Sequence, residues 1–389
     1  MNTLTAAMNT LSAAMNKSAT MNTPTASSTH SLPSPTPQSG RMEWLDAMRG
    51  FTMILVVAYH VAQFGFAESE KTSASLPFLV LFRMPLFFFV SGFLAYKSRW
   101  VWTMSSYGSL VWKKVKVQVL PALVFLCVYL VLRGRLPFAE GFVHCMQSPT
   151  KGGYWFTWVL LQMFALYYTV AAVASRWGKR TEDFSIAVLW LATLFAYLSL
   201  YMPHTFGKWY KTDFMMYSSI YETLKFLHFF LLGNIVHRHW HRTQRLFDTR
   251  YFFPLIAVIA FLSCADIFKW HYLNGQWTNL PKTLAMYSLL ALVIMFFRHY
   301  QQSFTTARPT GRVLQYIGTR TLDIYLLHFI LLPRLPHIGS WLDAHQPNFV
   351  VDIVLAVAVA AIVIAFCLLI SNVLRVSPLF SQYLFGRKR

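Results

Sequence analysis

The sequence predicts an all-α polytopic membrane protein with about ten transmembrane helices and both termini in the cytoplasm. Three observations lead to this prediction: the composition, the recurrence of long apolar runs, and the basic residues between them. Of the 389 residues, 56% are hydrophobic and 12% are charged, about half the charge content of a soluble domain. This balance excludes an ordinary soluble enzyme and a disordered chain. The four cysteines lack metal-ligand spacing, and we predict neither a disulfide framework nor a metal site.

The two ends of the chain differ from the apolar region between them. Residues 1–40 contain one lysine, no acid and an imperfect Met-Asn-Thr repeat in a Ser/Thr/Pro-rich segment, a composition that cannot form a core. We therefore predict a disordered cytoplasmic tail at 1–40 and a short basic cytoplasmic tail at 377–389. The transmembrane domain is predicted to span 41–376.

Ten apolar runs after Trp44 are long enough to cross a bilayer, which requires about 20 residues. They are 44–66, 76–96, 112–132, 154–175, 184–202, 218–236, 251–268, 279–297, 313–333 and 349–374.

Basic residues in the connections predict the orientation. With the amino terminus inside, 22 Lys and Arg fall on the cytoplasmic face and nine on the outer face, as the positive-inside rule requires. The net charge of +20 is therefore assigned to lipid headgroups and orientation, and we expect no nucleic-acid partner. The nine outer residues are Lys71, Arg133, Arg135, Lys151, Lys208, Lys211, Lys269, Lys282 and Arg334.

The first span carries polar residues on one helix face. Arg49 and His60 are eleven residues apart, which is within about 20° of three full helical turns and about 16 Å along the axis. Asp46, one turn before Arg49, is placed to pair with it. Arg49 near the cytoplasmic boundary suits a phosphate, and a neutral imidazole at depth suits proton transfer. Each residue also has a structural interpretation, as a snorkelling anchor for Arg49 and an interhelical hydrogen bond for His60.

Other polar residues are predicted to reach the same depth as His60. Arg83 lies in the second span, two residues before Pro85. Its structural interpretation is that it satisfies carbonyls freed where the proline breaks the helix. His328 lies near the outer end of the ninth span, and Trp155 and Glu222 also fall in the outer half. Intramembrane charges are usually functional, whereas Asp352 is expected to be a solvated helix cap.

Four ordered motifs resemble the membrane acyltransferase family 3. Leu45-Asp46-Ala-Met-Arg49-Gly50, followed by ten residues and His60, resembles its Arg-x10-His signature. The segment from Phe82 to Phe93, with Arg83 and Ser91, resembles its second-helix motif. Tyr154-Trp155-Phe156 resembles its Trp-Phe element, and Gly318 to His328, which contains Tyr325, is similar to its late-helix signature.

The resemblance implies transfer of an acyl group, usually acetyl, from cytoplasmic acyl-CoA to a hydroxyl of an extracytoplasmic or lipid-linked glycan. His60 would be the catalytic base and Arg83 its catalytic partner, while Arg49, oriented by Asp46, would bind the donor. His328, Tyr325, Trp155, Glu222 and Ser91 are possible acceptor-binding or supporting residues. The expected partners are acyl-CoA, a carbohydrate acceptor and membrane lipids, with no permanently bound cofactor. The expected localisation is the inner (plasma) membrane, as a multi-pass protein.

A transporter or flippase for a small molecule or lipid-linked sugar is the alternative, because intramembrane Arg and His also suit substrate relays. An arginine at the cytoplasmic edge on the same face as a deep histidine favours a long donor over a midplane transport site. A purely structural scaffold leaves this shared face unexplained.

Overall fold

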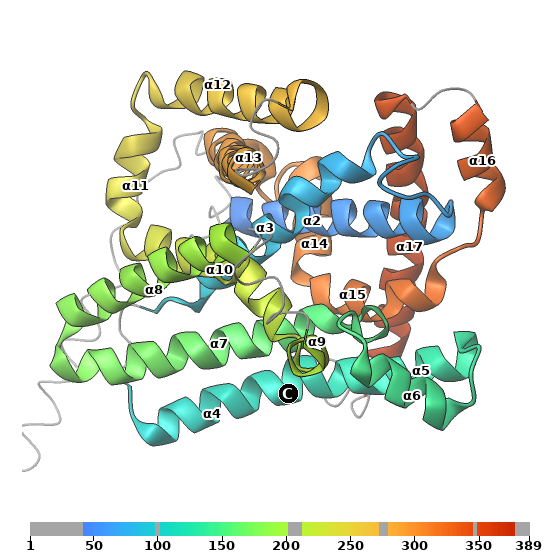
Figure 1. Ribbon diagram of the computed structural model, residues 1–389, viewed down its shortest axis with the longest axis horizontal. Coiled ribbons are helices and arrows are strands. Elements are labelled where there is room, and N and C mark those ends of the chain that lie inside the picture. Colours follow the sequence, from blue (N-terminus) through green and yellow to red (C-terminus); the bar gives the residue numbers. More distant parts are fainter. Residues whose placement is uncertain (1–41, 98–101, 201–211, 272–278, 345–347, 378–389) are drawn as a thin grey trace, which may run out of the picture. The chain divides into compact units, whose positions relative to one another are not determined.

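The computed structural model of the chain describes residues 42–97, 102–200, 212–271, 279–344 and 348–377, and these ranges contain helices and no strand (Figure 1). The predicted tail at 1–40, and the tail at 377–389 beyond Ser377, lie outside the described residues. The all-α class is confirmed.

The helices follow one another with short connections. In the first half they are α2 (Glu43–His60), η1 (Val61–Gly65), α3 (Leu76–Ala95), α4 (Met104–Lys114), η2 (Val115–Val119), α5 (Leu120–Arg133), α6 (Phe138–Gln147), η3 (Lys151–Gly153), α7 (Trp155–Ala174), η4 (Ser175–Trp177) and α8 (Lys179–Leu200). In the second half they are α9 (Asp213–Ser218), α10 (Ile220–Arg238), α11 (Trp240–Phe247), α12 (Phe252–Ala265), η5 (Asp266–Trp270), α13 (Asn279–His299), η6 (Gln301–Phe304), α14 (Pro309–Thr319), α15 (Thr321–Leu331), α16 (Pro336–Ala344) and α17 (Phe349–Leu374).

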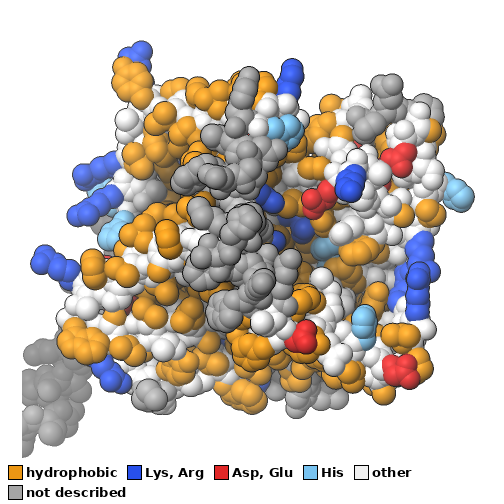
Figure 2. Space-filling view, viewed as in Figure 1, with side chains coloured by type: hydrophobic (Ala, Val, Ile, Leu, Met, Phe, Trp, Pro, Cys, Tyr) orange, Lys and Arg blue, Asp and Glu red, His pale blue; other side chains and the backbone are white. Residues whose placement is uncertain are grey.

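Eight helical segments of the described chain are long and apolar enough to cross a membrane. They are Glu43–Gly65, Leu76–Ala95, Ser105–Arg133, Trp155–Trp177, Lys179–Ser199, Phe252–Trp270, Asn279–His299 and Phe349–Leu374. Large apolar side chains on these helices are exposed, for example Phe261 on α12 at 68% and Phe366 on α17 at 54%. Figure 2 shows hydrophobic side chains spread over much of one face. Such a surface suits lipid, and the chain is a multi-pass membrane protein.

The sixth predicted span forms α10, which is not among those eight segments and carries charged residues near both ends. Glu222 and Lys225 lie near its start and Arg238 at its end. The middle of α10 is surrounded by protein, with Phe229 and Phe230 fully buried, and the helix packs along α3. The charged residues lie near the ends of α10, while its middle is buried among other helices, an arrangement that avoids exposing charge to lipid.

The ninth predicted span is broken in two, which the continuous apolar run did not reveal. α14 ends at Thr319, Arg320 leaves helical geometry (φ −114°, ψ 17°), and α15 begins at Thr321. At 1.5 Å per residue, the eleven residues of α15 span about 16 Å, too little to cross the bilayer alone. The count of ten crossings and the cytoplasmic placement of both termini stay predictions.

Helix α2 lies where the halves of the chain meet, because it packs against α3, α14, α15 and α17. Its contact with α14 is very close: a Cβ on Gly50 would lie 2.0 Å from the carbonyl oxygen of Leu314. A Cβ on Gly318 would likewise lie 1.8 Å from the carbonyl oxygen of Asp46. Both glycines belong to the motifs noted above, and they hold the polar face of α2 against the start of α15.

Candidate active site

Arg49 forms contacts that tie the first half of α2 to α15. Its Nη1 donates to Asp46 Oδ1 at 3.2 Å and its Nη2 donates to Thr321 Oγ1 at 3.1 Å. The structure therefore contains the Asp46–Arg49 pair that the helical spacing allowed. Thr321 was missed by the sequence reasoning, because nothing in a hydropathy pattern shows which side of the ninth span faces α2.

His60 forms a buried pair with His328. Their rings stack with centroids 5.1 Å apart, and His328 Nε2 lies 3.1 Å from His60 Nδ1. His328 is fully buried and His60 is 9% exposed. Counting residues placed the two at one depth, and the structure brings them into direct contact.

Backbone carbonyls decide which nitrogen carries each proton. His328 Nδ1 lies 2.8 Å from the carbonyl oxygen of Tyr325 and 3.1 Å from that of Ile324. Because a carbonyl only accepts, Nδ1 carries the hydrogen, and Nε2 of a neutral His328 is a bare acceptor. His60 Nδ1 must then donate to it. This leaves the lone pair of His60 on Nε2, the arrangement that a general base requires.

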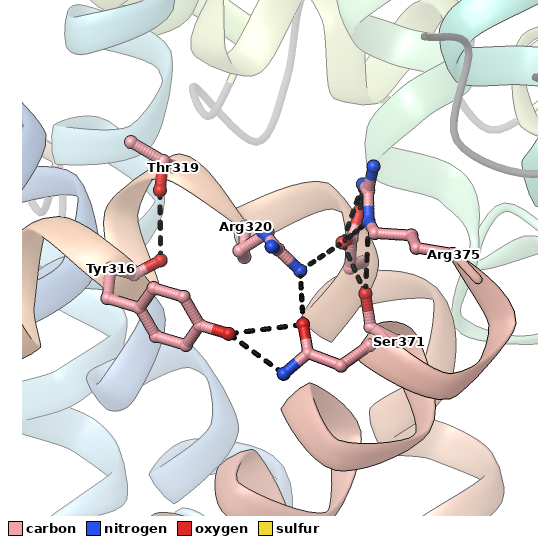
Figure 3. Close-up of polar contacts among 7 residues, drawn as sticks. Tyr316, Thr319, Arg320, Ser371 and Arg375 are labelled. Atoms are coloured by element: carbon pink, nitrogen blue, oxygen red, sulfur yellow. Dashed lines mark hydrogen bonds and ion pairs between the residues drawn. The ribbon is translucent and has the colours of Figure 1, made fainter. Parts of the chain in front are cut away.

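A polar network fixes α15, and with it His328, against α17 (Figure 3). Arg375 Nη2 donates to both carboxylate oxygens of Asp323, at 2.8 and 2.7 Å, and Ser371 Oγ donates to Asp323 Oδ2 at 2.6 Å. Arg320, at the break between α14 and α15, donates to Asn372 Oδ1 at 2.8 Å. A bidentate arginine–carboxylate pair is geometrically specific, so the orientation of α15 is fixed one and a half turns before His328.

Arg83 lies buried on α3 over the ring of Tyr59, with its guanidinium carbon 3.5 Å from the ring centroid. The side chain is 9% exposed, and its buried Nε has no hydrogen-bond partner among the described residues. A buried donor without an acceptor is costly, unless a substrate oxygen supplies one. Tyr59, adjacent to His60, was not singled out from the sequence.

His60 and Arg83 line one cavity of about 670 Å³. It follows the polar face of α2 through Val56 to Met53, one turn from Arg49, and it also reaches residues of the predicted outer connections after α5 and α15. Positions 49, 53, 56 and 60 form one helical stripe. The cavity therefore extends along α2 from Met53 past His60 to residues of the predicted outer connections.

Tyr325 and Trp155 also line this cavity. The Tyr325 hydroxyl donates to the carbonyl of Gly153 at 3.0 Å and accepts from the amide of Phe156 at 3.2 Å. Gly153 has φ +100°, and a Cβ there would lie 2.6 Å from the Phe329 ring. This turn lets the start of α7 approach α15 and carries Trp155 to the cavity wall.

Five of the predicted residues do not line the cavity: Asp46, Arg49 and His328, whose contacts are given above, and Glu222 and Ser91. Glu222 lies 4.0 Å from Lys225 on α10, and Ser91 Oγ donates to the Phe87 carbonyl one turn earlier at 2.9 Å. Three outer arginines, Arg133, Arg135 and Arg334, do line it, although the sequence reasoning counted them only for orientation. In the described part of the chain, no group of three His, Cys, Asp or Glu residues could hold a metal ion.

Two acids, Glu68 and Asp352, lie near the connection that follows η1. Asp352 is 2% exposed and accepts from Ser73 Oγ at 2.5 Å and from the amide of Ser75 at 2.9 Å. It is therefore not the solvated cap that was expected, because the 66–75 connection covers it. Burial, and then the nearby Asp352 carboxylate, raise the pKa of Glu68 in this connection to about 7.

A family model described as an acyltransferase domain matches residues 42–372. The chain belongs to acyltransferase family 3. The match covers every motif residue named above, and it establishes a membrane acyltransferase. No curated protein matches the chain, and no solved structure does.

Proposed function

We propose that this acyltransferase moves an acetyl group from cytoplasmic acetyl-CoA to a hydroxyl of an extracytoplasmic or lipid-linked glycan, in the inner (plasma) membrane. The observation that carries the proposal is the cavity along α2, which runs from Met53, one turn from Arg49, past His60 to the outer connections. A substrate with phosphates at one end and a thioester at the other fits this layout. Arg49 binds the phosphates, and the arm extends along Met53 and Val56.

The transfer step is direct. The acceptor hydroxyl oxygen attacks the thioester carbonyl carbon while His60 Nε2 takes the hydroxyl proton. His328 keeps His60 Nδ1 protonated through their 3.1 Å hydrogen bond. Arg83, whose Nε has no partner among the described residues, stabilises the oxyanion of the tetrahedral intermediate. The carbon–sulfur bond then breaks, and the proton on His60 passes to the CoA thiolate.

The test uses purified full-length protein in nanodiscs with acetyl-labelled CoA. We expect label transfer to a glycan acceptor, or slow donor hydrolysis without one, and loss of both in His60→Ala. The matched control is His337→Ala, an exposed histidine of the predicted outer face that does not line the cavity. Full turnover in His60→Ala refutes the mechanism. Donor-independent uptake of a sugar into vesicles, without turnover, would favour the transporter.

A further inference from the structure

The outer part of the cavity is lined by positive charge without acidic residues. Arg133, Arg135 and Arg334 lie there, and Arg83 and His60 lie deeper. Among the described residues that line the cavity, none is Asp or Glu. A cavity with one sign of charge concentrates ligands of the opposite sign.

The distribution of basic residues makes this lining unusual for an outer face. The positive-inside rule depletes the outer connections of Lys and Arg, and nine remain there by the predicted topology. Three of these nine are arginines, and all three line the cavity. Arginine differs from lysine in presenting a planar fork that binds carboxylate or phosphate bidentately.

The part of the cavity that carries these arginines, here called the rim, is held by two sets of contacts. Arg133 Nη2 donates to the carbonyls of Ile330, in the last turn of α15, and of Leu332, just after it, at 2.8 and 3.2 Å. The amide of Leu335 donates to the carbonyl of Gly65 at 2.7 Å, which pins the Arg334 loop beside the outer end of η1. The rim is thereby attached to both elements that carry the histidine pair.

Two rim arginines are available to a ligand. Arg135 and Arg334 are exposed, and in the described ranges neither makes a hydrogen bond or an ion pair with another residue. We infer that the hydroxyl acceptor is acidic: it carries a carboxylate or phosphate that Arg135 and Arg334 bind at the rim while its hydroxyl reaches His60. This inference rests on the proposed function and names its acceptor class.

Binding is tested first, because it does not depend on turnover. The protein is held in phosphatidylcholine nanodiscs, and affinity is measured for a hyaluronan tetrasaccharide and for its carboxyl-reduced form. A second arm compares glucose 6-phosphate with glucose, which separates phosphate from carboxylate recognition. We expect the acidic form of at least one pair to bind about tenfold or more tightly, with a preference that weakens at high salt.

The variants are Arg135→Gln and Arg334→Gln, with Lys71→Gln as the control. Lys71 is exposed, belongs to the same predicted face, and does not line the cavity. Each arginine variant should lose most of the preference for the acidic probe, and Lys71→Gln should keep it. Equal affinities within both pairs, including no measurable binding of either form, overturn the inference. So does an equal effect of all three variants.

Two further measurements separate the alternatives. If the arginines only anchor lipid, the arginine variants should change in stability when the nanodisc lipid is phosphatidylglycerol, but their affinities for the probes should equal those of the wild type. That result refutes acceptor recognition. Turnover of labelled acetyl-CoA, measured in parallel, reports on the proposed function itself. Turnover with no preference for acidic probes refutes this inference alone, whereas acidic-probe binding without any turnover refutes the acyl transfer.

Discussion

The hydrogen bond between His60 and His328 makes the strongest prediction, because it assigns His328 a positioning role. His328→Ala removes the acceptor that lies 3.1 Å from His60 Nδ1. The proton on His60 can then move to Nε2, which is the nitrogen that must be bare to accept the hydroxyl proton. His328→Gln is the conservative variant, since its side-chain carbonyl can still accept from Nδ1.

The magnitude follows from one buried hydrogen bond. Leaving a buried donor without its partner costs about 1–3 kcal/mol. At about 1.4 kcal/mol per tenfold change, this predicts a loss of about 5- to 150-fold in kcat for His328→Ala. His60→Ala removes the base itself, and the loss there should reach about 10² to 10⁴-fold. His328→Gln should recover most of the loss seen in His328→Ala.

The assay is steady-state acetyl transfer with purified variants, preceded by a check that each remains monodisperse. Because His328 contacts His60 and does not line the cavity, kcat should fall while the KM for acetyl-CoA stays near wild type. Wild-type kcat in His328→Ala refutes the reasoning. Equal losses in His328→Ala and His328→Gln would also refute it, since they would indicate a packing role rather than control of the proton position.

Three further predictions concern other groups near the cavity. Arg49→Ala should raise the KM for acetyl-CoA by about tenfold or more, because a charged hydrogen bond is worth about 1.5–3 kcal/mol; an unchanged KM would place the donor phosphates elsewhere. Arg83→Met should lower kcat by about 10² to 10³-fold with little change in either KM, and a pure KM effect would exclude an oxyanion role. For Glu68, whose pKa is raised from 4.5 to about 7, the folded state holds a proton that the unfolded state has lost. Stability should therefore fall as pH rises from about 4.5 to about 7 and then level off. Glu68→Gln should flatten this trend in thermal unfolding, and a wild-type curve that rises over the same window would contradict the assignment.

The sequence predicted the features that depend on helical periodicity. Eleven residues between Arg49 and His60 placed them on one face of α2, and the cavity lining at Met53 and Val56 follows that same stripe. Counting along the spans also placed His328 at the depth of His60. Depth alone does not decide whether two side chains meet, because the rotation of each helix about its axis also determines where a side chain points. Glu222 shares the predicted depth but lies beside Lys225 on α10.

Other features depend on contacts that no pattern in a single sequence records. The ninth span breaks at Arg320, two residues after the close contact between Gly318 and the Asp46 carbonyl, while the hydropathy of 313–333 stays continuous. When Lys and Arg are counted in each connection between spans, Arg133 and Arg334 contribute only to the predicted orientation. Their position at the cavity depends on how α5 and the loop after α15 meet in space.

A histidine rather than a carboxylate as the partner of His60 follows from the charge around it. A buried ionised acid is costly in a low-dielectric site unless a cation pairs with it, and Arg83 lies in the same cavity. An acid at position 328 would therefore attract the Arg83 guanidinium and occupy the donor that has to meet the oxyanion. Neutral His328 orients the base without that competition, because its own Nδ1 proton is taken by backbone carbonyls. For this reason His328→Gln, which stays neutral, is the variant expected to rescue, and His328→Asp should fail even though its carboxylate can accept the same proton.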